Sequence, residues 1–502
     1  MSHSRIGLIA IALILATLLT SSLIAGRTAE EYKAHTRAYQ KSSETNVAAP
    51  QLGERIPLWS CIPFAGVLLS IAIIPMVAPT FWHHHFAKIA IGWGLIFALP
   101  FFMVYGGEGL YELSHVMLGE YLPFIILLWG LFTVSGGIYL SGSLVGKPVV
   151  NLSILVIGTI LASWMGTTGA AMLLIRPLIR ANKDRKYKVH TIVFFIFLVA
   201  NVGGLLTPLG DPPLFLGFLN GVPFFWTFKM WNKFLFSVGY LVVAYYAIES
   251  VLYARESKAR NQQVASREPL RVQGGINFVY LVGIVAAVLM SGSLHLGEFT
   301  LAGLHFTYQS LLRDVLIVAM GVLSLKTTSK QVRQSNGFSW FPIKEVAFLF
   351  IGIFMTIVAP LKILQAGSAG AAHAIVAAVH SPASYFWVSG LLSSFLDNAP
   401  TYLTFFNMSL GDLGILPGQV HAILSNQLAH PMTAQFIIDL TAISAGAVFF
   451  GANTYIGNAP NFMVRSIAEE SRVQMPSFFG YMLWSGAVLI PLFLLMTFVF
   501  FR

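Results

Sequence analysis

Runs of apolar residues, each about as long as a bilayer-spanning helix, alternate with short polar loops along almost the whole chain. A helix needs roughly 20 apolar residues to cross the hydrocarbon core. By this criterion the chain contains about eleven transmembrane helices. They are expected at residues 6–25, 58–79, 87–105, 120–140, 190–220, 232–252, 276–290, 309–325, 345–362, 433–470 and 477–500. The pattern therefore predicts an all-α polytopic membrane protein.

Two further apolar segments, 149–180 and 383–410, are interrupted by polar residues near their middle. If each is a re-entrant hairpin, the basic loops 176–188, 255–271 and 326–344 all fall on one side, which the positive-inside rule identifies as cytoplasmic. A full crossing by the first segment would put its two basic flanks on opposite sides. We therefore expect two re-entrant helical hairpins, the first entering from the cytoplasm and the second from outside.

The two halves of the chain share a polar motif inside apolar spans. Residues 207–215 read T-P-L-G-D-P-P-L-F and residues 454–462 read T-Y-I-G-N-A-P-N-F. Each copy interrupts an apolar span, and each follows one of the interrupted hairpins. Because the two units enter from opposite sides, we expect an inverted-topology repeat. Such repeats place binding sites near the bilayer midplane, where the repeats meet.

These patterns divide the chain into four parts. The first is a signal peptide or an N-terminal anchor with a polar segment outside the cytoplasm. Two repeats follow, separated by a cytoplasmic linker, and each contains a hairpin and a broken helix. The bounds are 1–57, 58–252 (hairpin 149–180, broken helix 190–220), 253–275 and 276–502 (hairpin 383–410, broken helix 433–470).

Composition supports the membrane assignment and excludes other classes. The chain is 56% hydrophobic and only 10% charged, whereas soluble domains carry roughly 25% charged residues. The net charge of +10 does not indicate nucleic-acid binding, because the basic residues lie in short loops between apolar spans. The single cysteine, Cys61, excludes an intramolecular disulfide and a multi-cysteine metal site.

The interruptions themselves carry the candidate chemistry. Glycine and proline open the helical backbone, and the freed carbonyls join side-chain oxygens in a ligand set that suits a hard cation. Isolated breaks could be packing kinks, and either aspartate could cap the helix after it, but two matched breaks favour a site. The candidate cation- and proton-binding residues are Asp397, Asp211, Asn398, Thr167, Thr168, Thr207, Asn453, Thr454 and Asn458.

Asp211 and Asp397 are the carboxylates of this set. An aspartate in the middle of a transmembrane helix is costly and usually serves an ion or proton pathway. Burial favours the protonated carboxyl group, whereas a bound cation favours the carboxylate. One carboxylate can thus hold either a proton or a metal ion. That competition is sufficient for exchange, with sodium expected at Asp397, Asn398, Thr167, Thr168 and Asp211.

Four ordered segments resemble the ion transporter superfamily, in particular its bacterial branch of putative citrate transporters and sodium/proton antiporters, related to arsenite permeases. They are 163–170 (SWMGTTGA), 206–213 (LTPLGDPP), 396–401 (LDNAPT) and 451–461 (GANTYIGNAPN), and the resemblance covers about residues 55–500. It implies a homodimer in the bacterial inner membrane, with a scaffold part, a mobile transport part and elevator-type alternating access. It also implies sodium near the hairpin tips and helix breaks.

The resemblance departs from the dicarboxylate carriers of the superfamily at both tips. Those carriers have Ser-Asn-Thr triplets, whereas this chain has Gly-Thr-Thr and Asp-Asn-Ala. The acidic second tip is more similar to the antiporter and arsenite branches.

The leading functional hypothesis is therefore sodium/proton exchange by a secondary transporter that is not an enzyme and needs no cofactor besides the sodium ion itself. The alternative is sodium-coupled uptake of a small carboxylate such as citrate, since half-helix N-termini can hold an anion. No Arg or Lys lies at either tip or break to support it. An intramembrane aspartyl protease is a remote alternative, because Asp211 follows Pro-Leu-Gly rather than that family's Gly-x-Gly.

Overall fold

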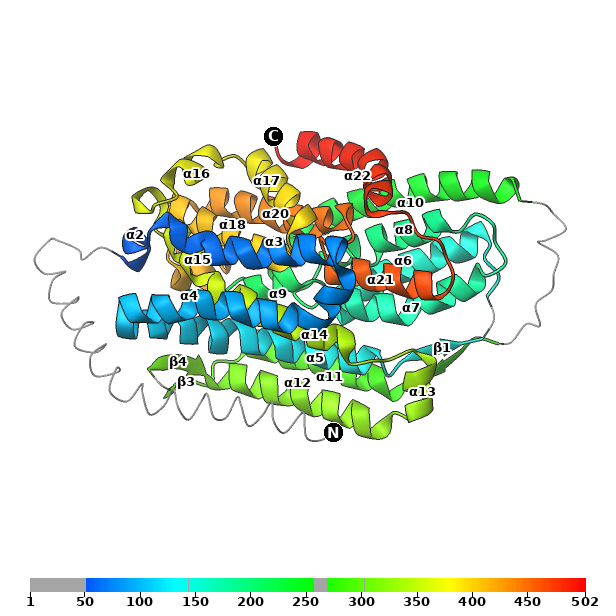
Figure 1. Ribbon diagram of the computed structural model, residues 1–502, viewed down its shortest axis with the longest axis horizontal. Helices are drawn as coiled ribbons and strands as arrows, with labels where there is room; N and C mark the ends of the chain where they lie inside the picture. The colour runs from blue at the N-terminus through cyan, green and yellow to red at the C-terminus, as the bar shows by residue number, and fades with distance from the viewer. Residues whose placement is uncertain (1–50, 143, 257–268, 302) are drawn as a thin grey trace, which may run out of the picture.

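The computed structural model describes residues 51–142, 144–256, 269–301 and 303–502. The first apolar run, almost all of the segment 1–57 and most of the linker 253–275 lie outside the described residues. The remainder is largely helical, with its helices arranged side by side along the long axis of the molecule (Figure 1).

The helices of the first half mostly begin with proline in the first turn, where its missing amide hydrogen costs no helical bond. Their bounds are α2 (Leu52–Arg55), α3 (Ile62–Val77), α4 (Pro79–His115), α5 (Leu122–Ser135), α6 (Pro148–Met165), α7 (Thr167–Ala181), α8 (Val189–Leu198), α9 (Pro212–Leu219) and α10 (Trp231–Ala254).

Several helices of the second half begin at a side-chain cap, for example at Ser381, Asp397 and Ser477. Their bounds are α11 (Ile276–Ser293), α12 (Tyr308–Thr327), α13 (Lys330–Ser335), α14 (Phe341–Thr356), α15 (Val358–Gln365), α16 (His373–Ala378), α17 (Pro382–Phe395), α18 (Asn398–Leu413), α19 (Val420–Leu424), α20 (Thr433–Phe450), α21 (Ala459–Glu470) and α22 (Phe478–Phe500).

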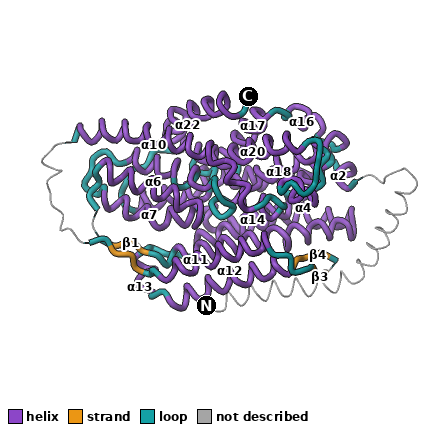
Figure 2. Tube along the Cα trace, turned by 180° about the vertical axis from the view of Figure 1, so that it is seen from behind, coloured by secondary structure: helices purple, strands orange, loops and turns teal. Residues whose placement is uncertain are grey.

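Four short strands form two antiparallel pairs. β1 (Tyr139–Ser141) pairs with β2 (Arg271–Gln273), and β3 (Glu298–Leu301) pairs with β4 (Leu304–Thr307). Figure 2 shows these pairs near opposite ends of α11 and α12. They are short, and most of their residues are exposed or half-buried, with Leu304 of β4 as the buried exception.

The described residues contain seven helical segments that are long and apolar enough to cross a membrane, or eight if the bent pair α14–α15 is one span. The all-α polytopic class is thus confirmed, whereas the count of about eleven spans stays a prediction. The expected span 87–105 and most of the expected span 120–140 fall in one segment of 56 residues, Thr80–Ser135. The chain breaks within that segment at Gly106, which has a φ of +54°.

The helices form two packed groups. The flanking bundle consists of α3, α4, α5, α11, α12 and α14, in which α14 packs on α4 and α12 packs on both α11 and α5. The hairpin bundle consists of α6–α10, α17, α18 and α20–α22, in which α17 and α18 pack on α20, and α7 packs on α21. In Figure 1, α11 and α12 lie below and α17, α20 and α22 lie above.

Both interrupted segments are helical hairpins. The first reverses at Gly166, whose φ of +79° is a conformation that glycine adopts readily. Its two ends meet, since the amide of Gly146 donates to the carbonyl of Ala181 at 2.8 Å. The second reverses at Asp397, and α17 packs along α18. Entry of each hairpin from one membrane face stays a prediction.

Candidate cation and proton site

The two helix breaks have matching local geometry. α8 and α20 end in a short 3-10 turn, Val202–Gly204 in the first break and Gly451–Asn453 in the second. In each break a threonine hydroxyl donates to a serine carbonyl on the neighbouring hairpin, Thr207 to Ser163 and Thr454 to Ser394. The same hydroxyls accept the amides of Leu209 (3.1 Å) and Ile456 (3.2 Å). Each break is thereby fastened to its hairpin.

Glycines let the backbone double back within each break. A Cβ atom on Gly210 would lie 2.2 Å from the carbonyl oxygen of Gly204, and one on Gly457 would lie 2.7 Å from that of Gly451. Real Cβ atoms do not approach so closely, so the two glycines of the shared motif are required by the fold.

Asp211 lies where both hairpin tips and both breaks converge. Its side chain is only 1% exposed. One carboxylate oxygen accepts the hydroxyl of Thr167 (3.1 Å) and the amide of Asn458 (3.0 Å). The other accepts the amide of Asn398 at 2.5 Å. Three neutral donors from the first tip, the second break and the second tip therefore hold one carboxylate.

The two aspartates differ in what they do for the adjacent helix. Asp211 occupies the N-cap position of α9, but its side chain makes no cap hydrogen bond. Asp397 does cap α18, since its Oδ1 accepts the amide of Ala399 at 3.1 Å. Asp397 is also half-buried rather than buried. The cap role thus belongs to Asp397, and the enclosed carboxylate is Asp211.

A cavity opens beside these residues, between the two bundles. The hairpin bundle contributes a polar wall that includes Thr167, Thr168, Asp211, Asp397 and Asn458. α5 and α14 of the flanking bundle contribute an apolar wall. None of the described residues that line the cavity is Lys, Arg or His. The ion pairs found among the described residues likewise omit both aspartates.

Two buried amide oxygens of the candidate residues have no hydrogen-bond donor among the described residues. They are Oδ1 of Asn398, which is fully buried, and Oδ1 of Asn453. Buried polar atoms are normally satisfied, so an unsatisfied carbonyl-type oxygen beside a carboxylate fits a cation ligand. Oxygen atoms of this kind are the donors that hard cations prefer.

The candidate residues named from the sequence fall into two sets. Thr167, Asn398 and Asn458 each donate a hydrogen bond to Asp211, and Asp397 and Thr168 line the cavity beside them. The structure places the other three in the fastenings of the breaks. Thr207 and Thr454 donate to serine carbonyls of the hairpins. The side-chain amide of Asn453 donates to the hydroxyl of Ser394 at 2.9 Å.

A second layer of polar residues was not identified from the sequence. Asn201 donates to Asn461 at 2.7 Å, and Asn461 in turn donates to the carbonyls of Gly451 (2.7 Å) and Thr454 (2.9 Å). The carbonyl oxygens of Ser163 and Ser394 accept the hydrogen bonds from Thr207 and Thr454. The sequence did contain a signal for these two serines, since each lies three residues before the residue at which its hairpin turns, Gly166 or Asp397.

A family model described as putative citrate transport matches residues 53–501, nearly the whole chain. No individually curated protein gave a significant match.

Proposed function

The chain belongs to the putative citrate transport family, and from that premise we propose that this multi-pass secondary transporter exchanges sodium ions for protons across the bacterial inner membrane. The observation that carries the proposal is the setting of Asp211. It is a buried carboxylate with three neutral hydrogen-bond donors. No described ion pair includes it.

A buried negative charge without a partner is expensive. Two species can neutralise Asp211, a proton on the carboxyl group or a sodium ion beside it. Both use the same oxygen atoms, so binding one displaces the other. This mutual exclusion is the requirement for exchange.

The sodium ligands that we propose are Asp211, Asn398, Thr167, Thr168 and Asp397. Asn398 supports this set because its amide nitrogen faces Asp211 while its carbonyl oxygen has no donor. Asp397 adds a second carboxylate to the same cavity. The remaining residues, Thr207, Asn453, Thr454 and Asn458, hold the breaks and the carboxylate in place.

We also propose that the hairpin bundle moves against the flanking bundle, as an elevator. The wall that the flanking bundle presents to the cavity is apolar and includes Leu128, Leu131, Ile343 and Phe350. Such a face makes few directional contacts, so it offers little resistance to sliding. The flanking bundle would stay in place and pair with the flanking bundle of a second copy in a homodimer. Native mass measurement in lipid nanodiscs tests this pairing, and detection of monomer alone contradicts it.

Sodium-coupled carboxylate uptake is the second candidate, favoured by the family's description. One structural observation agrees with it, because the N-termini of α7, α9, α18 and α21 all lie at residues that line the cavity or contact Asp211. Helix N-termini favour anions. The lining nevertheless contributes no Lys or Arg from the described residues to balance several carboxylates.

The hydrogen bonds of Asp211 disfavour an aspartyl protease, since Asp211 is bonded to threonine and asparagine rather than to Asp397.

Transport by the purified chain in proteoliposomes separates the candidates. A sodium gradient should drive proton movement, read with an enclosed pH dye, in the absence of any carboxylate. Labelled citrate should not accumulate above the level of empty vesicles. Sodium-driven citrate uptake without proton movement in its absence overturns the proposal in favour of the second candidate.

A further inference from the structure

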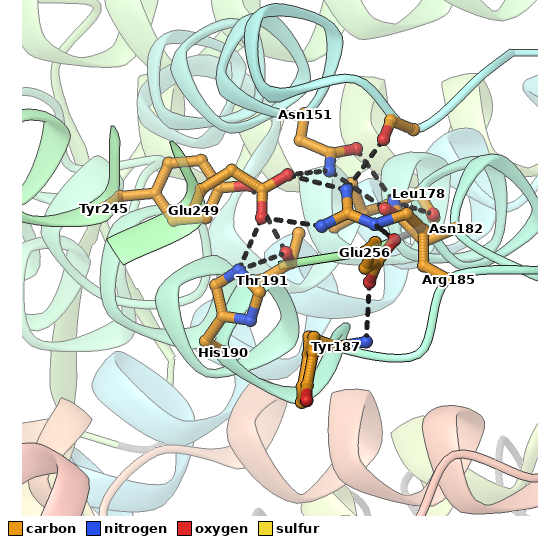
Figure 3. A network of polar contacts seen from close by, with 11 residues as sticks. Asn151, Leu178, Asn182, Arg185, Tyr187, His190, Thr191, Tyr245, Glu249 and Glu256 are labelled. Atoms are coloured by element: carbon orange, nitrogen blue, oxygen red, sulfur yellow. Dashed lines mark hydrogen bonds and ion pairs between the residues drawn. The ribbon is translucent and has the colours of Figure 1, made fainter. Parts of the chain in front are cut away.

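The open ends of the two hairpins are built differently. At the open end of the first hairpin, Glu249 of α10 is fully buried and pairs with Arg185 at 2.8 Å (Figure 3). Arg185 also donates to the carbonyl of Gly146, which precedes α6, at 2.8 Å. Asn151, near the start of α6, donates to the same glutamate at 3.0 Å. A buried carboxylate and a guanidinium thus hold the first hairpin to α10.

A buried carboxylate also lies at the open end of the second hairpin. It belongs to Asp439 in the second turn of α20, a helix that packs on both arms of the hairpin, α17 and α18. The side chain is 1% exposed, and its Oδ1 accepts the side-chain amide of Gln435 at 2.8 Å. None of the ion pairs among the described residues includes Asp439. This carboxylate therefore has a neutral donor but no cationic partner.

The sequence explains why Asp439 has no cationic partner. Residues 363–464, which contain the whole second hairpin and α20, include no Lys and no Arg. Lys362 and Arg465, on either side of this stretch, pair with glutamates of their own at 2.8 and 2.9 Å. A buried charge without a partner is costly. Asp439 must therefore be neutralised from solution, by a proton or by a cation.

Two hydroxyl groups beside Asp439 favour a cation. Tyr385 of α17 and Ser409 of α18 are fully buried, and neither hydroxyl oxygen has a hydrogen-bond partner among the described residues. Ser409 faces both the carboxylate of Asp439 and the hydroxyl of Tyr385. Buried hydroxyls are normally satisfied. A proton on the carboxyl group supplies a single donor, whereas a cation can be bound by the carboxylate and by both hydroxyl oxygens.

The charges around this group of oxygens suit a monovalent ion. Among the described residues, Asp412 of α18 is the other carboxylate that faces Asp439. It is exposed and therefore hydrated, and His380 faces Asp412 rather than Asp439. One unbalanced carboxylate requires one positive charge. Carboxylate and hydroxyl oxygens are ligands that hard cations prefer.

We propose that Asp439, Ser409 and Tyr385 bind a sodium ion that joins α17, α18 and α20 at the open end of the second hairpin. The ion does there what the guanidinium of Arg185 does at the open end of the first. The site lies about 16 Å along α18 from the hairpin tip, so it is separate from the cavity beside Asp211. Such an ion stays in place, and its binding is therefore independent of sodium/proton exchange.

Thermal unfolding of the detergent-purified full chain tests this site in an Asp211→Asn background, where the carboxylate of the cavity no longer competes for sodium. Sodium chloride replaces choline chloride at constant ionic strength. Saturating sodium should raise the unfolding temperature of the background protein by about 1–3 °C, and Asp439→Asn should remove most of this gain. Tyr385→Phe should be as stable as its parent in choline chloride, because the lost hydroxyl has no hydrogen-bond partner. It should raise the sodium concentration at half-saturation by at least about tenfold.

Two controls make the same chemical changes elsewhere. Asp412→Asn alters an exposed carboxylate on α18, and Tyr246→Phe removes an exposed hydroxyl on α10. Both should leave the half-saturating sodium concentration within about twofold of the parent value.

Three results overturn the sodium site. They are a background protein that sodium does not stabilise, a gain that falls by less than half in Asp439→Asn, and a half-saturation that Tyr385→Phe leaves unchanged. If Asp439→Asn does not fold, the titration of Tyr385→Phe decides alone. Absence of sodium/proton exchange in proteoliposomes contradicts the proposed function and leaves this test unaffected.

Discussion

Replacing Asp211 with asparagine removes the enclosed carboxylate and leaves most of its contacts possible. The Oδ1 of the new asparagine can still accept from Thr167 and Asn458, which contact one carboxylate oxygen in the native site. Its amide nitrogen would meet the amide nitrogen of Asn398, now 2.5 Å from the other oxygen. A half-turn of the Asn398 amide restores a donor–acceptor pair and uses the oxygen that has no partner.

The variant should therefore fold and fail to exchange. Exchanging charged for neutral hydrogen bonds changes stability by about 1–2 kcal/mol. The loss to a bound cation is larger, because two unit charges 4 Å apart attract by about 4 kcal/mol at an effective dielectric constant of 20. That energy corresponds to roughly a thousandfold in sodium affinity. The proton-binding group disappears as well, so exchange should fall by at least about 100-fold.

The assay is sodium-driven proton movement in proteoliposomes, with folding checked by size-exclusion chromatography and thermal unfolding. Asp412→Asn is the matched control, since it makes the same change at an exposed carboxylate near the end of α18. It should retain near-wild-type exchange. A folded Asp211→Asn protein that exchanges at more than half the wild-type rate would falsify the assignment of this carboxylate.

Three further predictions follow from the site and its supports. The proposed competition of protons and sodium for one carboxylate predicts that exchange rises with pH and that more sodium shifts the pH profile towards acid; a profile independent of sodium contradicts competition. Cysteines placed at positions 147 and 183, in a background lacking Cys61, should be labelled from the same side of the membrane, and labelling from opposite sides rules out the re-entrant hairpin. Gly210→Ala should destabilise the protein by roughly 1–3 kcal/mol, because the new Cβ would lie 2.2 Å from a carbonyl oxygen. Thermal unfolding measures this loss, and the control Gly239→Ala, which has open space around it, should have the smaller effect.

The sequence was sufficient to locate the breaks and hairpins, because glycine, proline and polar residues inside apolar spans have few structural explanations. The sequence did not predict that both hairpin tips and the second break would contact Asp211. Asn398 is 187 residues from Asp211 in the chain, and Asn458 is 247 residues away. Their contacts depend on how the hairpins pack. The sequence also did not predict where each threonine side chain points. Thr207 and Thr454 were expected at the cation, whereas their hydroxyls donate to serine carbonyls of the hairpins.

Other residues were overlooked although the pattern contained a signal. Glu249 stands in the last turns of an apolar helix, where a carboxylate needs a partner. Arg185 was counted only as a basic loop residue, yet its side chain is 7% exposed and pairs with that carboxylate. Charges on either side of a helix end are hard to pair from sequence alone, because the loop between them can turn in many ways.

The contact between Asp211 and Asn458 joins corresponding positions of the two breaks across 3.0 Å. Had both copies kept asparagine, the pair would be neutral and would carry nothing that titrates. Had both kept aspartate, two like charges would lie within hydrogen-bonding distance and one proton would stay trapped between them. Because the two copies of the repeated motif differ at this one pair of positions, the contact contains a single titratable carboxylate and a neutral donor to it.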